Sequence, residues 1–172
     1  MLRLYLVRHA GTAATRTPVV PDDEPALGVL PDLTRWSGRA GRVVTSPARR
    51  CRVDGAEVEP RLRPWDLGGW SGRSFDELDL AGWRSDPAYD AHGGESLLAL
   101  CARVRGLLEV WQQGEGRVVA VTHAAVIKAA VTHAFGAPPA SCWAFDVAPG
   151  SLTELHGTAD GWRVVRVNQH DR

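Results

Sequence analysis

Lysine is nearly absent from this chain. Among its 172 residues Lys128 is the only lysine, and arginine supplies the rest of the 20 basic residues. A Walker-type phosphate loop needs a Gly-Lys pair, so this mode of nucleotide binding is excluded. Arginine, in contrast, is abundant, and its planar fork donates bidentate hydrogen bonds to phosphate oxygens.

The sequence also lacks an excess of one charge and any long hydrophobic run. The 20 basic residues balance 20 acidic ones, whereas nucleic-acid-binding proteins usually have a basic surplus. No apolar stretch reaches the length of a membrane span, and the apolar run 1–7 is too short for a signal peptide. We therefore expect neither a nucleic acid nor a membrane as partner, and the sequence does not indicate an oligomeric state.

Cysteine is scarce. The three cysteines, Cys51, Cys101 and Cys142, are odd in number, widely spaced and without a C-x-x-C pair. This pattern favours buried free thiols in a reducing compartment over a disulfide framework or a zinc site, and it predicts a cytoplasmic protein. No two histidines stand at i and i+4, so we expect no metal and no other cofactor.

The length is that of one domain, and we expect residues 1–172 to form a single unit. Apolar strand patterns alternate with helical ones, which predicts an α/β three-layer sandwich with a mainly parallel central sheet and helices on both faces. The proline-rich segment 15–31 is expected to be a surface excursion. Strands are expected at 2–7, 42–45, around 58, 117–121, 143–147, 152–156 and 162–167, and helices at 95–111, at 124–135 and from Ser46-Pro47 onward.

Unusual polar residues follow three of the expected strands. They are Arg8-His9 after the first strand, Arg49-Arg50 shortly after the second, and Thr122-His123 after the most apolar one. Ligands of an open parallel sheet bind outside the carboxyl ends of its strands, where helix N-termini also point. Two histidines and two or three arginines would converge there, which predicts a site for a dianion such as phosphate.

Other histidines and one of the two adjacent arginines are not expected to belong to this site. His133 falls inside an apolar helical pattern, and His92 and His156 follow no buried strand, so we expect structural roles for all three. Because Arg49 and Arg50 are adjacent, at most one of them should reach the site.

Four segments together resemble the histidine phosphatase superfamily, in its phosphoglycerate-mutase-like branch. The run Leu6-Val7-Arg8-His9-Ala10-Gly11-Thr12 is similar to L-V-R-H-G-x-T, and Ser46-Pro47-Ala48-Arg49-Arg50 is similar to S-P-L-x-R. Gly93-Gly94-Glu95-Ser96 with Arg103 resembles G-G-E-S…R, and the run from Val119 to Ile127 resembles V-V-S-H-G-G-V-I. Each motif alone is weak, but four in the right order are specific.

The resemblance implies a phosphomonoesterase that forms a phosphohistidine. His9 would be the nucleophile, while Arg8, Arg50 and His123 would bind the phosphate oxygens and neutralise their charge. Thr12 and Ala124, near these residues, would take part in substrate binding. Positioning and electrostatic stabilisation dominate phosphoryl transfer, so this set of residues suits the reaction without a metal or organic cofactor.

The sequence departs from the family pattern at the general acid. Many relatives have L-x-E-x-x-x-G-x-W-x-G, and anchoring on Gly68 puts Pro64 at the glutamate position. Asp66 stands two residues later, and we predict that it is the general acid and base. Its competing interpretation is a turn residue. Asp76 and Glu77 are the next candidates, although a solvated helix face suits them better.

Tryptophans flank the predicted acid, which suggests a leaving group with an apolar or aromatic part. Trp65 or Trp70 would contact it, with Trp36 and Trp83 in adjoining loops. A purely structural role in the core is about equally expected for such residues.

Three other functions compete with the phosphatase. A phosphomutase of the same fold is disfavoured because the acid segment Pro64-Trp65-Asp66-Leu67-Gly68 differs from the E-R-H-Y-G of mutases. An inactive phosphate-binding module would be expected to lose some of the four phosphate-binding residues. A serine esterase is disfavoured because Gly69-Trp70-Ser71-Gly72-Arg73 misses the G-x-S-x-G pattern. The substrate itself is not identified by the sequence.

Overall fold

A six-stranded mixed sheet forms the centre of the molecule. The structure is a computed structural model, in which residues 1–39 and 41–170 are described. The strand order is β3-β2-β4-β1-β5-β6. The first four of these strands are mutually parallel, and β5 and β6 complete the sheet in antiparallel pairs. The strands are β1 (Leu2–Arg8), β2 (Arg42–Thr45), β3 (Glu57–Val58), β4 (Gly116–Thr122), β5 (Leu152–Thr158) and β6 (Gly161–Gln169).

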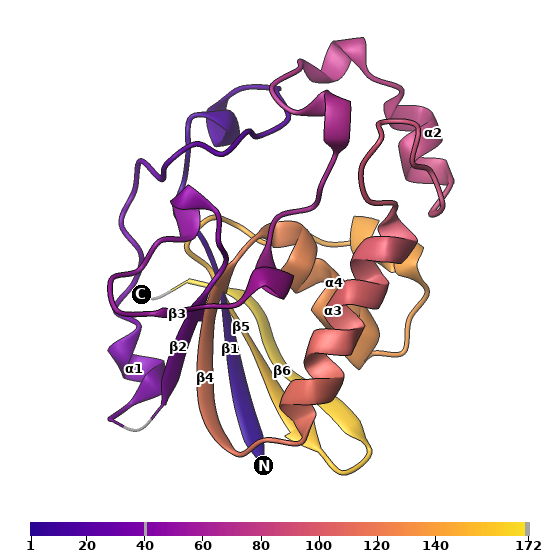
Figure 1. Ribbon diagram of the computed structural model, residues 1–172. Coiled ribbons are helices and arrows are strands. Elements are labelled where there is room, and N and C mark those ends of the chain that lie inside the picture. Colours follow the sequence, from indigo (N-terminus) through magenta and orange to yellow (C-terminus); the bar gives the residue numbers. More distant parts are fainter. Residues whose placement is uncertain (40, 171–172) are drawn as a thin grey trace.

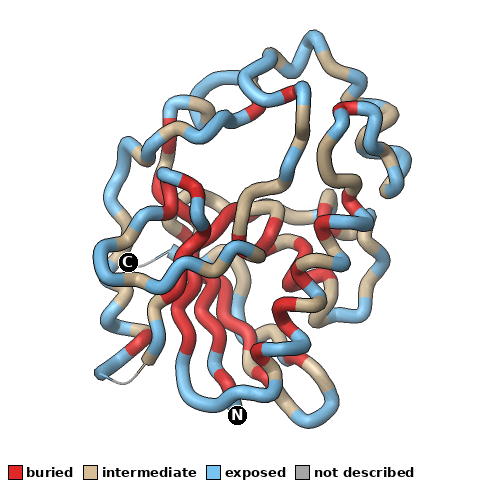
Figure 2. The backbone as a smooth tube through the Cα atoms, viewed as in Figure 1, coloured by how far each residue is buried: buried red, intermediate tan, exposed pale blue. Residues whose placement is uncertain are grey.

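The two central strands are the most apolar in sequence. Both β1 and β4 are almost wholly buried over their second halves, as expected of parallel strands that are covered on both faces. Figure 2 shows burial concentrated in these strands and in the parts of the helices that face them. The expected strands 2–7, 42–45 and 117–121 are confirmed, as is the final hairpin around Asp160-Gly161.

One face of the sheet is covered by two long helices, α3 (Leu97–Gln112) and α4 (Ala124–Ala134) (Figure 1). The Ser96 side chain accepts a hydrogen bond from the amide of Ala99, so it caps α3 as a serine at this position commonly does. Leucines of α3 and the apolar residues of α4 join β1 and β4 in the main core. Both helices lie within one or two residues of the expected ranges.

The other face has a lighter cover. Only α1 (Thr34–Ser37) and adjoining loops pack there within the described residues, with Leu33 and Trp36 against Tyr5 and Val119. The α/β sandwich with a mainly parallel sheet is therefore confirmed, and its second helical layer is a single short helix. The remaining helical elements are α2 (Leu80–Ser85) and the 3-10 turns η1 (Ala14–Arg16), η2 (Arg49–Cys51), η3 (Pro60–Leu62), η4 (Gly68–Trp70), η5 (Phe75–Glu77) and η6 (Pro139–Trp143).

Two expected elements are wrong. No α-helix starts at Ser46-Pro47, where the chain makes only the three-residue turn η2, and the Ser46 hydroxyl is engaged by His123 instead of capping a longer helix. The expected strand 143–147 is a 3-10 turn followed by irregular chain, because the prolines 138 and 139 initiate a turn there. In both places a local turn preference outweighs the apolar pattern.

The segments that follow the parallel strands gather at one end of the sheet. β1 begins beside the N-terminus and runs away from it, and the segments 9–23 and 63–96 lie beyond its far end (Figure 1). The expected surface excursion 15–31 is only partly correct, because Val20 is buried and Pro21 to Asp23 face a cavity. No helix in the described part of the chain is long and apolar enough to cross a membrane.

Candidate active site

Strand register brings the two candidate histidines together. In the parallel pair of β1 and β4, Arg8 stands opposite Thr122, so His9 and His123 leave the sheet side by side. The amide of His9 donates to the carbonyl of Thr122 at 2.9 Å, and the two imidazole centroids are 5.2 Å apart. The convergence expected from the sequence is therefore a direct result of how two buried strands pair.

The imidazole ring of His9 is oriented by a hydrogen bond at its Nδ1 atom. Its Nδ1 atom lies 2.8 Å from the carbonyl oxygen of Ala10, which can only accept, so Nδ1 carries the proton. In the neutral ring the lone pair is then on Nε2. The pKa of His9 is lowered to about 4, mainly by burial and further by the charges of Arg50 and Arg8. The imidazole is consequently neutral, and nucleophilic, near pH 7.

Two arginines are fixed beside His9 by backbone carbonyls. Arg8 donates from Nη1 to the carbonyl of Val147, and Arg50 donates from Nη1 to that of Asp22 at 2.7 Å. Arg50 is buried, whereas Arg49 is exposed, so one member of the arginine pair reaches the site as expected. Neither guanidinium near His9 forms an ion pair with a carboxylate within hydrogen-bonding distance among the described residues.

His123 is held by a serine that sequence reasoning did not assign to the site. The Ser46 Oγ atom lies 2.8 Å from His123 Nε2 and also accepts a hydrogen bond from the amide of Ala48. When the hydroxyl donates to Nε2, the Nδ1 proton of a neutral His123 is available to a ligand. Burial lowers the pKa of His123 well below its usual value, and Arg50 and His9 lower it further, so this residue is a neutral donor in the free protein.

Three donors at this site have no hydrogen-bond partner among the described residues. They are Arg8 Nε, Arg50 Nε and His123 Nδ1, and all three atoms are buried. Buried donors are nearly always paired in native proteins. Three unpaired donors around one cavity, two of them cationic, fit an oxyanion with several acceptor oxygens. The site therefore has the chemistry of a phosphate-binding site.

A cavity of about 560 Å³ joins these residues to the predicted acid. Arg8, His9, Arg50, His123, Ala124, Trp65 and Asp66 all line it. Thr12 does not line it, and the buried Thr12 hydroxyl has no hydrogen-bond partner among the described residues. Asp22 and Asp23 line the cavity but were not predicted. A run of three acidic residues, 22–24, within a proline-rich segment was the only sequence signal for them.

Asp66 lies on an exposed loop at the wall of this cavity. Its Oδ1 atom accepts a hydrogen bond from the amide of Gly68 at 2.9 Å, so the turn role proposed as the alternative is present. The side chain is exposed and the residue lines the cavity, which leaves its carboxyl group accessible to a ligand. Asp76 and Glu77 are not among the cavity's lining residues, and Glu77 pairs with Arg73.

Glycines allow the Asp66 loop to approach the start of α3. A Cβ atom at Gly94 would overlap the carbonyl oxygen of Asp66, and one at Gly68 would overlap that of His92. The amide of Glu95 donates to the carbonyl of Asp66 at 2.7 Å, which joins the two segments. Glycine is required at these positions because no other residue permits such a close backbone approach.

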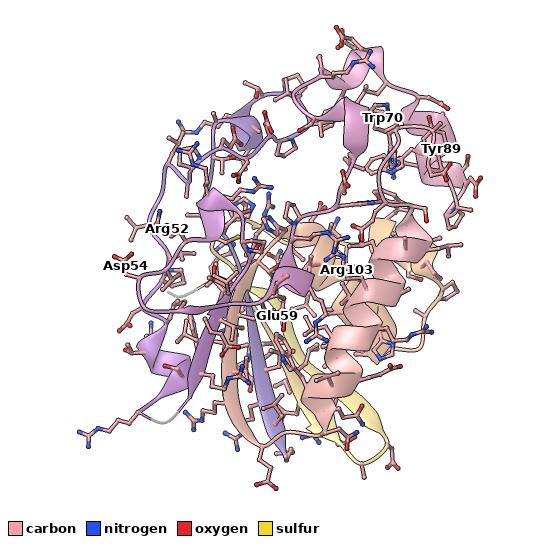
Figure 3. All side chains as sticks on the ribbon, in the orientation of Figure 1. Arg52, Asp54, Glu59, Trp70, Tyr89 and Arg103 are labelled. Atoms are coloured by element: carbon pink, nitrogen blue, oxygen red, sulfur yellow. The ribbon has the colours of Figure 1, made fainter. Side chains whose placement is uncertain are left out.

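The same junction contains a buried ion pair. Glu95 accepts hydrogen bonds from Arg103 at 2.7 Å through both of its carboxylate oxygens, and Arg63 adds a third at 2.8 Å. Arg103, labelled on α3 in Figure 3, also donates to the backbone carbonyls of Arg61 and Arg63. The Glu95–Arg103 pair thereby fixes the chain that leads to Asp66.

The tryptophans divide between the cavity and the packing around it. Trp65 lines the cavity, and its Nε1 atom donates to the carbonyl of Glu95 at 2.8 Å. Trp70 is buried against Trp83 and Tyr89 and lies outside the cavity lining (Figure 3). Trp36 packs on the opposite face of the sheet. A ligand-contacting position is thus available to Trp65 and not to Trp70.

The three histidines expected to be structural lie outside the lining of this cavity. His92 accepts from the amide of Gly94, and His156 lies 2.6 Å from Glu154. His133 is in the second half of α4, remote from the strand ends. Within residues 1–39 and 41–170 no group of three or more histidine, cysteine or acidic side chains is arranged to hold a metal ion.

The sequence matches one protein-family model. Residues 37–170 match the model of the histidine phosphatase superfamily (branch 1). The chain is 27% identical over 192 aligned positions to phosphoserine phosphatase 1 of Hydrogenobacter thermophilus, covering 91% of this chain and 87% of the relative. It is 31% identical over 102 positions to glucosyl-3-phosphoglycerate phosphatase of Mycobacterium tuberculosis, covering 56% of this chain and 44% of that protein.

Solved structures share the whole fold. A mycobacterial glucosyl-3-phosphoglycerate phosphatase in complex with VO3 superposes with a TM-score of 0.77 at 25% identity, covering 98% of this chain and 99% of that one. A phosphoserine phosphatase mutant from Entamoeba histolytica, with bound phosphoserine, superposes with a TM-score of 0.79 at 17% identity, covering 98% and 97%. The second likeness is informative about the fold alone.

Proposed function

Because the chain belongs to branch 1 of the histidine phosphatase superfamily, we propose that it hydrolyses the phosphate monoester of a small metabolite through a phosphohistidine on His9. The observation that carries this assignment is the set of three unpaired, buried donors on residues that line one cavity with His9. Phosphoryl transfer requires positioning and charge stabilisation more than covalent help from the protein, and these residues supply both.

The first step forms a bond between His9 Nε2 and phosphorus while the bond from phosphorus to the leaving oxygen breaks. Arg8 and Arg50 neutralise the charge on the non-bridging oxygens, and the His123 Nδ1 proton is donated to one of them. Asp66 gives its proton to the departing alcohol. These donors are pre-oriented by the carbonyls of Val147 and Asp22 and by Ser46, so little reorganisation is needed during the reaction.

The second step releases phosphate. The Asp66 carboxylate takes a proton from water, the water oxygen bonds to phosphorus, and the nitrogen–phosphorus bond breaks to restore neutral His9. Asp66 suits both steps because it faces the cavity from an exposed loop, where protons exchange readily with solvent.

The substrate class is a small phosphorylated metabolite. The cavity of about 560 Å³ falls within the ordinary range for sites that bind small molecules. The names of two relatives contain phosphoserine and glucosyl-3-phosphoglycerate, and both compounds are phosphate esters of small metabolites. Neither is assigned to this chain, whose cavity wall includes Trp65, Asp22 and Asp23.

We further propose that residues 1–172 act as one domain in a reducing compartment, the cytoplasm. β1 lies between β4 and β5 in the sheet, so no cut in the sequence separates two self-contained units. All three cysteines are free, and Cys51 and Cys142 are buried. A protein with this cysteine use fits a reducing environment.

The test is to trap the covalent intermediate. The protein would be mixed with a labelled phosphate ester, quenched, and compared after alkaline and acid treatment. We expect label that is stable in alkali, lost in acid and absent from His9→Ala, since phosphohistidine is labile in acid. An acid-stable adduct would instead identify a serine or another nucleophile and overturn the proposal.

A chelator provides the second arm of the test. Activity should persist in EDTA and be inhibited by vanadate, which mimics the trigonal-bipyramidal phosphorus. Loss of activity in EDTA with recovery on adding zinc or magnesium would convert the histidines from nucleophile to metal ligands and contradict the assignment.

A further inference from the structure

A second, smaller cavity opens beside the active-site cavity. We call it the tryptophan annex. Its volume is about 190 Å³, and its walls include Trp65, Trp83, Trp143, Leu97, Leu100 and Lys128. The annex shares Trp65, Ala124 and Ala125 with the active-site cavity. A molecule whose phosphate lies on His9 can therefore extend past Trp65 into the annex.

Three indole rings form one contiguous surface in the annex. The ring centroids of Trp65 and Trp83 are 4.8 Å apart, those of Trp83 and Trp143 are 4.8 Å apart, and those of Trp65 and Trp143 are 5.7 Å apart. These separations are typical of aromatic rings in favourable contact. Such walls suit a planar ring, which can stack on one indole and meet the edge of another.

Polar donors within this surface lack partners. The Nε1 atoms of Trp83 and Trp143 are buried and have no hydrogen-bond partner among the described residues, unlike Nε1 of Trp65. A buried donor without an acceptor is unfavourable, and a ligand with acceptor atoms removes that cost. The annex is thus lined mainly by apolar side chains, and two of its lining tryptophans have an unpaired indole N–H group.

The only lysine of the chain lies at this cavity. The side chain of Lys128 is 18% exposed, and its Nζ atom is 3.2 Å from Asp146, whose side chain is 98% exposed. An ion pair with so exposed a carboxylate contributes little to stability, so another anion can readily replace Asp146. Lys128 can accordingly turn to an anionic group at the edge of the annex.

We propose that the annex binds the leaving-group side of the substrate, and that this part is an aromatic ring with an anionic or acceptor substituent. The size is appropriate, because an apolar cavity of about 150 Å³ is known to hold one benzene ring. The tryptophans pack against the ring, and Lys128 binds the anionic or acceptor substituent. This inference rests on the proposed phosphatase activity and adds the chemical class of its substrate.

The test compares phosphate esters whose leaving alcohols have similar acidity. Benzyl, 2-phenylethyl and 3-phenylpropyl phosphates vary the reach from phosphorus to ring, and ethyl phosphate has no ring. We expect the best of the three to exceed ethyl phosphate by about tenfold or more in kcat/KM, as burial of an apolar group in a matching pocket commonly achieves. The matching phosphonates should rank in the same order as competitive inhibitors.

A variant then assigns the preference to the annex. Trp83→Ala removes one ring of the annex without touching the His9 site, and it should reduce the advantage of the best arylalkyl ester over ethyl phosphate to about threefold or less. Trp36→Ala is the matched control, because Trp36 is a similarly half-buried tryptophan on the opposite face of the sheet. It should leave the preference unchanged. Thermal melts would establish that each variant is folded.

A carboxylate on the ring tests the role of Lys128. Adding a para-carboxylate to the best arylalkyl phosphate should improve its kcat/KM by about threefold or more in the parent protein, since charged hydrogen bonds exceed neutral ones, and not in Lys128→Met. An unsubstituted ring should be treated alike by both proteins.

The outcomes separate this inference from the function on which it rests. A protein that hydrolyses ethyl phosphate but favours none of the three ring esters by more than about twofold retains its proposed function and overturns the annex as a ring site. A protein inactive on every ester, with no trapped phosphohistidine, overturns the proposed function itself. A ring preference that survives in Trp83→Ala but disappears in Trp36→Ala also contradicts the annex.

Discussion

The two ends of the active-site cavity are built differently. At the phosphate end, His9 and His123 project from the ends of central strands, are buried, and are held by hydrogen bonds to fixed backbone or hydroxyl groups. At the leaving-group end, Asp66 lies on an exposed loop, and its one side-chain hydrogen bond is to a residue of the same turn. The first end directly continues two strands of the sheet, whereas the second is a loop attached to the segment that begins α3.

This contrast matches the demands of the reaction. Every phosphate monoester presents the same dianionic group, so a rigid and buried set of donors can serve all substrates. Leaving groups differ in shape and in their need for a proton, and loops accommodate such variation without disturbing a core. In the proposed mechanism, phosphate binding falls to residues at strand ends, and protonation of the leaving group falls to a loop that glycines and the Glu95–Arg103 pair hold in place.

Removing the proposed nucleophile should have the largest effect. His9→Ala is expected to reduce kcat by about 10⁴-fold or more on every phosphate ester, since loss of a covalent nucleophile disables the entire pathway. Steady-state phosphate release measures this. His133→Ala, a half-buried histidine remote from the cavity, is the control and should keep activity within about twofold of the parent, as substitutions away from a site usually do. A His9→Ala protein of ordinary activity would remove the phosphohistidine mechanism.

Changing the predicted acid should have a smaller and selective effect. Asp66→Asn cannot donate a proton but keeps an oxygen that can accept from Gly68, so the turn is preserved. We expect a loss of about 100-fold on an alkyl phosphate and a much smaller loss on p-nitrophenyl phosphate, whose leaving group needs little protonation.

Asp76→Asn is the matched control for this experiment, because that exposed carboxyl lies outside the cavity lining. It should leave both rates unchanged. Equal, small losses on both substrates in Asp66→Asn would show that the proton has another source. Asp22 and Asp23, which line the same cavity, would then be the next residues to replace.

The contact that holds the Asp66 loop against the start of α3 can be weakened without replacing His9, His123 or Asp66. In Gly94→Ala the new Cβ atom would overlap the carbonyl oxygen of Asp66 and push the loop away from α3. We expect a loss of about tenfold in kcat/KM on an alkyl phosphate, from displacement of Asp66, with less effect on p-nitrophenyl phosphate. Gly106→Ala, in α3 with open space around it, is the control and should be neutral or slightly stabilising. A Gly94→Ala protein with parent activity on both esters would mean that the contact does not position Asp66.

The phosphate end was predictable from the sequence because its geometry follows from strand pairing. Buried strands are recognisable in the sequence as short apolar runs. Residues that directly follow two neighbouring parallel strands lie at the same edge of the sheet. This reasoning placed His9 and His123 together, and the register of β1 against β4 brings them there. The identity of Arg50 rather than Arg49 came from the family resemblance, and Arg50 is the buried one of the pair.

The leaving-group wall was less predictable because loops bring it together from distant segments. Asp22 and Asp23 reach the cavity from a proline-rich stretch with no periodic pattern, and Ser46 binds His123 where an N-cap was expected. The annex needs Trp65, Trp83 and Trp143 from three separate segments, and no local pattern signals their contact. Tertiary packing alone sets these positions.

The smallest effect concerns how pH acts on the buried phosphate end. The pKa of His9 is lowered in the folded protein to about 4, chiefly by burial, whereas an unfolded histidine titrates near 6.5. Between these values the unfolded state binds more protons, so the free energy of unfolding falls as the pH falls.

Lowering the pH from 6.5 to 5.5 should therefore reduce the free energy of unfolding by about 1 kcal/mol more in the parent protein than in His9→Asn. Urea unfolding at the two pH values measures the difference. A His9→Asn protein with the parent's full pH response would mean that His9 does not titrate as a buried, neutral imidazole, and the rigid end of the cavity would then be more open to water than its contacts indicate.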